Sequence, residues 1–170
     1  PEHLDAARRV ARSSMVLLEN RGGVLPLKEG SRIALVGPFA DSRWDLIGSW
    51  VHFAEADRTS TFLDGLRARF GADRVTYARG CDPHKALEGG ISEAVAAAAK
   101  SDVVLVALGL KAGESGEAAS LASLALPDAQ RDLLESLKQT RKPIVILLVT
   151  GRPMELAREA ELADAVLLTW

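Results

Sequence analysis

Three short, almost uninterrupted apolar segments limit what this chain can fold into. They span residues 32–37, 103–108 and 143–149; the first ends in Gly37, and the other two are followed within two residues by Gly109 and Gly151. Strands that read as continuous apolar runs are typical of a parallel sheet covered on both faces. Helical segments separate these runs, and such alternation connects parallel strands by right-handed crossovers. The sequence therefore predicts an α/β fold, with an open, mostly parallel sheet sandwiched between helices.

The segments around these strands carry apolar residues at helical or strand spacing. A first amphipathic helix is predicted at residues 4–20, with Leu4, Val10 and Leu18 near one face and Gly22-Gly23 at its end. The other predicted helices are residues 59–70, capped by Thr59 or Ser60, 90–100, 127–140 and 154–161. Two further strands are predicted at residues 74–77 and 165–169.

The composition excludes several classes of protein. A chain of 170 residues is about one domain, and a net charge of −2 gives no electrostatic reason to bind nucleic acid or an anionic membrane. No apolar run approaches the roughly 18 residues that span a membrane. The single cysteine, Cys81, excludes a disulfide framework, and together with His84 it lacks the further ligands of a metal site. We expect neither a metal nor another cofactor.

The candidate site is the segment of residues 113–127, which lies between the apolar run 103–108 and the next predicted helix. In an open parallel sheet, ligands bind beyond the carboxyl ends of the strands. This segment is rich in glycine, serine and alanine, and it carries two carboxylates, Glu114 and Glu117. Glu117 is the catalytic candidate. The alternative for Glu117 is a solvated acid near a helix start, favoured by the helix dipole, and Glu114 is expected to be a solvated loop acid.

Other common motifs are missing. Gly37-Pro38 follows the first strand without a G-x-G-x-x-G pattern, and no Walker lysine motif occurs, which argues against a nucleotide site. The run from Gly113 to Glu117 lacks the final glycine of a serine-hydrolase elbow. The histidines of the chain show no arrangement that indicates a catalytic relay.

An ordered set of short motifs resembles a known family. The set consists of residues 14–20, 25–27, 33–38, 40–41, 48–50, 115–120, 126–127, 130, 151–153, 163–165 and 169–170. In this order they are similar to the second domain of glycoside hydrolase family 3, and in particular to its bacterial β-glucosidases. The resemblance covers essentially the whole chain.

The resemblance implies an architecture and a reaction. Family members pair a TIM-like barrel with an (α/β)6-sandwich-like domain, and the active site lies between them. The implied division is residues 1–30 as the connecting helix and linker from a barrel, and residues 31–170 as the sandwich, cut short at its C-terminal end. The barrel supplies an aspartate nucleophile, and Glu117 matches the glutamate that serves as general acid/base. The chain alone would then be catalytically silent.

The resemblance also implies a substrate and a location. The expected substrate is a β-linked glucoside or oligosaccharide, and the expected location is periplasmic or secreted. Trp50 matches a sandwich-domain tryptophan that lies near the aglycone side of the sugar site in some family members. The alternative for Trp50 is a core or domain-interface tryptophan.

Two positions depart from the family pattern. A glutamate commonly follows the central strand, where this chain has Leu110, and an arginine commonly stands where this chain has Leu121. Losing a charge together with its partner leaves no unpaired charge behind. The departures also leave a second interpretation open, a non-catalytic structural or carbohydrate-contacting α/β module. A third is a stand-alone α/β protein that binds a small metabolite.

Overall fold

A computed structural model describes residues 2–53 and 55–170 of the chain, and these residues form one mixed sheet flanked by helices. The strands are β1 (Val16–Asn20), β2 (Ile33–Val36), β3 (Val75–Ala78), β4 (Val103–Gly109), β5 (Ile144–Val149) and β6 (Ala165–Leu168). Their order in the sheet is β1-β6-β5-β4-β2-β3. All neighbouring pairs are parallel except β1 and β6, which are antiparallel. The predicted mostly parallel α/β sheet is confirmed.

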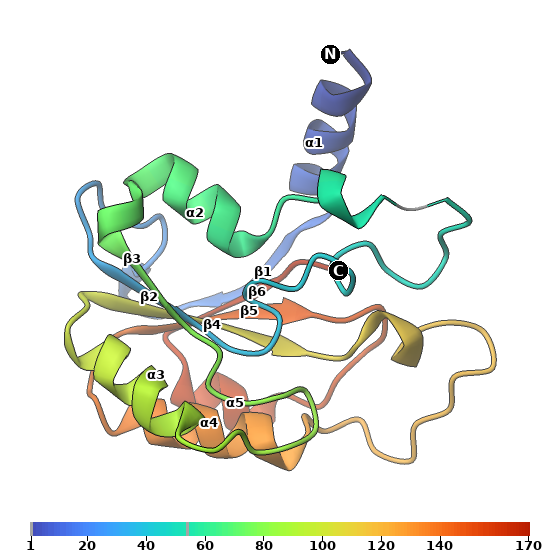
Figure 1. The fold of residues 1–170 in the computed structure, drawn as a ribbon. Helices are drawn as coiled ribbons and strands as arrows, with labels where there is room; N and C mark the ends of the chain where they lie inside the picture. Colours follow the sequence, from blue (N-terminus) through green and yellow to red (C-terminus); the bar gives the residue numbers. More distant parts are fainter. Residues whose placement is uncertain (1, 54) are drawn as a thin grey trace.

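Helices cover both faces of this sheet (Figure 1). The helices are α1 (Glu2–Ser14), α2 (Phe62–Phe70), α3 (Gly90–Ala99), α4 (Asp128–Lys138) and α5 (Ala157–Leu162). Figure 1 shows α3, α4 and α5 on one face and α2 on the other, while α1 projects away from the sheet. None of the α1 residues is buried.

The continuous apolar strands follow from this double coverage. In β4, Val104 and Val106 pack into the cluster on the α3–α5 side, whereas Val103 and Leu105 pack into the cluster on the α2 side. Every residue of β2, β4 and β5 is buried. Neither face of these strands meets water, so successive residues are apolar instead of alternating with polar ones.

The structure corrects the first predicted helix. That helix was predicted to run from residue 4 to residue 20, but α1 ends at Ser14 and Val16–Asn20 pairs with β6 instead. Leu4 and Val10, on the predicted inner face, are exposed. The apolar run at residues 16–18 forms a strand because the open edge of β6 offers unpaired main-chain N–H and C=O groups, which a strand can bond and a helix cannot.

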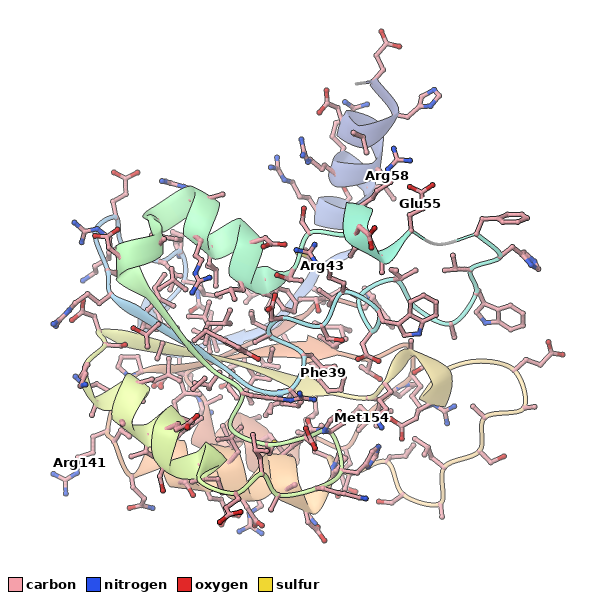
Figure 2. The ribbon with its side chains drawn as sticks, viewed as in Figure 1. Phe39, Arg43, Glu55, Arg58, Arg141 and Met154 are labelled. Carbon is pink, nitrogen blue, oxygen red and sulfur yellow. The ribbon has the colours of Figure 1, made fainter. Side chains whose placement is uncertain are left out.

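The start of α2 was also placed too early. The cap is Thr61, whose Oγ1 accepts a hydrogen bond from the Asp64 N–H at 3.1 Å, while the Thr61 N–H donates to Asp64 Oδ2 at 3.2 Å. This reciprocal pair is a capping box, which satisfies two main-chain donors at the helix start. Arg43, from the loop after β2, reaches the same carboxylate at 2.8 Å (Figure 2).

The helix predicted at residues 154–161 begins three residues later, at Ala157. The reason lies in the main chain of Glu155, whose N–H donates to the Leu124 carbonyl at 2.9 Å. The main chain of Glu155 is thus paired with the segment after β4 and cannot take part in the first turn of the helix. None of the helices in residues 2–53 and 55–170 has the length and apolar character to cross a membrane.

Candidate functional site

The candidate site lies at the carboxyl edge of the sheet, where the segments after β2, β4 and β5 come together. Figure 1 shows the loop after β2 and the loop after β4 extending from the same side of the sheet. We call residues 110–127 the acid loop, because it carries Glu114 and Glu117. Apart from the short 3-10 turn Ala112–Glu114 and an isolated bridge at Ala125, it has no regular secondary structure. Its position is the one that the strand order predicts for a ligand site.

Buried Gln130 fixes the start of the acid loop. Its side chain accepts a hydrogen bond from the Gly109 N–H at 2.8 Å, and it donates to the carbonyls of Gly109 at 2.9 Å and of Pro83 at 2.8 Å. Gly109 has φ +146°, and a Cβ there would lie 1.7 Å from the Val149 carbonyl oxygen. Only glycine therefore lets the end of β4 lie this close to β5.

The loop after β2 contacts the acid loop at two points. Asp45 Oδ1 accepts a hydrogen bond from the Ala112 N–H at 3.1 Å, and its other oxygen accepts one from the Ser42 hydroxyl at 2.6 Å. Gly116 packs against Ser49, since a Cβ at Gly116 would lie 3.2 Å from the Ser49 Cβ. The loop that bears the candidate Trp50 is thus packed, through the neighbouring Ser49, against the residue that precedes Glu117.

The segment after β5 holds the acid loop from the other side. The Gly151 N–H donates to Ser115 Oγ at 3.2 Å, and Arg152 Nη2 donates to the Ala119 carbonyl at 2.9 Å. Within the described residues, Arg152 Nε is buried without a hydrogen-bond partner. Ala118, directly after Glu117, has φ +60°, a conformation that costs a non-glycine residue about 1–3 kcal/mol. Such strained positions cluster at functional sites.

Glu117 and Glu114 differ sharply in their surroundings. The side chain of Glu117 is exposed, and it makes no hydrogen bond or ion pair with the described part of the chain. Glu114 was expected to be a solvated loop acid, and this is wrong. Its Oε1 lies 2.8 Å from His84 Nε2, its Oε2 accepts a hydrogen bond from the Lys111 N–H at 2.8 Å, and its side chain is 20% exposed. Glu114 is thus engaged within the domain, whereas Glu117 is exposed to solvent.

The tryptophans of this edge are exposed. Trp50 is 71% exposed and Trp44 63% exposed, so neither belongs to the core of this domain. A small cleft of about 60 Å³ lies between the loops and is lined by Asp45, Ser49, Ser115 and Trp170 among others. Neither Glu117 nor Trp50 lines it. Both indole rings are therefore open to solvent and offer an apolar face to a ligand.

Leu110 and Leu121, which depart from the family pattern, lie in the same place. Both line a cavity of about 390 Å³, together with His84, Glu114 and Arg131. Leu110 is buried and Leu121 is partly buried. Because Leu110 and Leu121 face the same cavity, replacing a charged pair by two leucines at these positions leaves no unpaired charge.

No group of three His, Cys, Asp or Glu side chains in residues 2–53 and 55–170 is arranged to hold a metal ion. Cys81 is buried, and this burial raises the pKa of its thiol to about 12. A thiol with so high a pKa stays protonated at neutral pH and is a poor nucleophile.

Sequence reasoning missed several residues that shape this site. Nothing in the sequence linked Asp45 to Ala112, which is 67 residues further on. His84 stands in an ordinary loop pattern with no signal for its contact with Glu114. Arg152 belongs to the motif of residues 151–153, but only the fold places its guanidinium against the Ala119 carbonyl.

Comparisons with known proteins agree with this architecture. Residues 15–170 match the family model described as the glycosyl hydrolase family 3 C-terminal domain. A periplasmic beta-glucosidase of Salmonella typhimurium is 40% identical, over 99% of this chain and 25% of the relative. A beta-xylosidase of Formosa agariphila is 31% identical, over 99% of this chain and 24% of the relative.

A crystal structure of a beta-glucosidase from Listeria innocua, in complex with isofagomine, superposes with a TM-score of 0.91 at 39% identity. The superposition covers 96% of this chain and 22% of that one. The chain thus spans about a quarter of the length of the relatives it matches.

Proposed function

Since the chain belongs to glycoside hydrolase family 3, as the C-terminal domain of β-glucosidase-like proteins, we propose that it provides the general acid/base, Glu117, of a retaining β-glycosidase. A TIM-like barrel elsewhere in the complete protein supplies the nucleophile in this proposal. The relatives at 39–40% identity are named as β-glucosidases, which supports a β-linked glucoside as the substrate.

The state of Glu117 is the observation that carries the proposal. Its carboxylate is exposed, whereas the chain on either side contacts Ser49, Gly151 and Arg152. A carboxyl group that must meet both a substrate and a second domain has to be accessible and yet fixed in position. Glu114 fails this requirement, because both of its oxygens already have partners within the domain.

The proposed chemistry needs two carboxyl groups about 5 Å apart. The barrel aspartate attacks the anomeric carbon while Glu117, protonated, gives its proton to the leaving oxygen. Glu117 then removes a proton from the water that hydrolyses the glycosyl intermediate. Docking of the barrel desolvates Glu117 and brings a second carboxylate near it, and both effects favour the protonated form that the first step requires.

The remaining expectations become proposals with separate support. Trp50 contacts the aglycone side of the sugar, which its 71% exposure permits. Residues 1–30 carry the connection from the barrel, and α1, which buries none of its residues here, is the part that leaves the sandwich. Arg58, labelled in Figure 2, lines a hollow together with Glu2, His3 and Leu4 of α1, so the segment before α2 borders this connection. A periplasmic or secreted location is supported by the periplasmic relative.

The test compares Glu117→Ala with Glu114→Ala in the complete protein, using an aryl β-glucoside with and without added azide. Removing a general acid/base lowers the rate by about 10²- to 10⁴-fold. Azide is a nucleophile that needs no base, so it should partly restore turnover of Glu117→Ala and give a glycosyl azide. Near-normal turnover of Glu117→Ala would remove it from this role. An inactive wild-type protein across many glycosides would favour the non-catalytic module instead.

A further inference from the structure

We infer that His84 and Glu114 form a positioning pair that holds the acid loop, and with it Glu117, at the edge of the sheet. The inference rests on the proposed role of Glu117. It concerns a contact between two loops that are 30 residues apart in the sequence, His84 Nε2 to Glu114 Oε1 at 2.8 Å.

Glu114 performs two tasks at once. Its Oε2 accepts a hydrogen bond from the Lys111 N–H at 2.8 Å, and the Glu114 N–H donates back to the Lys111 carbonyl at 2.9 Å. This reciprocal contact closes the first turn of the acid loop. With Oε1 on His84, the same carboxylate connects that closed turn to the neighbouring loop.

The His84 side of the pair is anchored in the core. The carbonyl of Pro83, the preceding residue, accepts a hydrogen bond from Gln130, which is 0% exposed. The Asp82 N–H donates to the Lys85 carbonyl at 2.9 Å and closes the turn that contains His84. The loop that carries His84, the partner of Glu114, is therefore attached to the buried helix residue Gln130.

Arg131 is the only lysine or arginine among the described residues that line the cavity around the pair. Leu110 and Leu121 form its apolar lining, and Arg131 at its rim is paired with Asp128 on its own helix. Among the described residues, His84 is thus the side chain that Glu114 contacts from outside the acid loop.

The consequence for Glu117 is local. It lies three residues after Glu114, in a stretch without regular secondary structure that contains the strained Ala118. Ion pairs between partly exposed groups add little to global stability. Misplacing a catalytic group by about 1 Å, however, can cost up to about 100-fold in rate. The pair should therefore influence catalysis more than unfolding.

The experiment uses three variants of the complete protein. His84→Leu removes the polar nitrogen of the pair, whereas His84→Gln keeps a polar nitrogen at nearly the same reach. Asp82→Asn is the matched control, because it breaks the Arg79–Asp82 pair in the same loop without touching Glu114. Amide hydrogen exchange of residues 112–120 reports on the loop. The ratio of kcat/KM for phenyl β-glucoside to kcat/KM for 2,4-dinitrophenyl β-glucoside reports on proton donation, which only the poor leaving group needs.

We expect His84→Leu to speed exchange of residues 112–120 about twofold to fivefold, as the loss of a partly exposed pair implies. The kcat/KM ratio should fall about threefold or more, and His84→Gln and Asp82→Asn should keep both values near wild type. Unchanged exchange in His84→Leu, or equal loss on both glucosides, would overturn the inference. Amide hydrogen exchange of residues 112–120 reports on the loop whatever the role of Glu117. A fully active Glu117→Ala variant would reject the proposed function without deciding whether the pair holds the loop.

Discussion

The side chain of Gln130 should contribute far more to stability than its neutral, polar nature suggests. It is 0% exposed and makes three hydrogen bonds to main-chain atoms, with the Gly109 N–H and with the carbonyls of Gly109 and Pro83. Gln130→Leu keeps a similar volume and opens no large cavity, but it leaves these three groups without their partner. At a net of about 0.5–1.5 kcal/mol per bond, the free energy of unfolding should fall by about 2–4 kcal/mol.

Equilibrium urea unfolding, followed by far-UV circular dichroism, measures this difference at constant m value. Gln139→Leu is the matched control, since it makes the same change on an exposed residue directly after α4 and should stay within about 0.5 kcal/mol of wild type. A loss of less than about 1 kcal/mol for Gln130→Leu, or an equal loss for both variants, would refute the reasoning.

Three further outcomes are expected. The hydrogen bond and ion pair with Arg32 lower the pKa of Asp102 from 3.8 to about 2. The stability that this pair adds is therefore present above about pH 4 and is lost as the pH falls toward 2. Asp102→Asn should flatten that part of a curve of Tm against pH, and an unchanged curve would contradict this expectation. The Cys81 thiol, with its pKa raised to about 12, should react with a disulfide reagent at pH 8 only in denaturant, and rapid labelling of the folded protein would contradict its burial. Gly109→Ala should cost at least about 3 kcal/mol in thermal or urea unfolding, because its Cβ would overlap the Val149 carbonyl, and a near-neutral result would show that the β4–β5 edge can relax.

Much of the fold could be predicted from the sequence because buried elements have a recognisable pattern of apolar residues. Strands covered on both faces must be apolar throughout, which made β2, β4 and β5 visible, and the amphipathic pattern of α4 placed Leu133, Leu134 and Leu137 inward. β1 could not be recognised in this way. Its residues are mostly exposed, and its strand state depends on pairing with β6, almost 150 residues away, which no local pattern encodes.

The site was predictable only in part, for a related reason. Strand order places the acid loop at the ligand-binding edge, and the resemblance singles out Glu117 within it. The supports of the loop come from Asp45, His84 and Arg152, each on a different connection. Contacts between loops depend on where the sheet brings them, and single polar residues in loops carry no period that would reveal their partners.

The most direct test of Glu117 as the general acid/base is a distance in a crystal structure of the complete protein. We expect its carboxyl carbon to lie about 5 Å from that of the nucleophilic aspartate, with the now exposed side chain enclosed between the two domains. A Glu117 that stays in solvent, or that lies about 9 Å or more from the aspartate while another carboxylate occupies the 5 Å position, would contradict the proposed role.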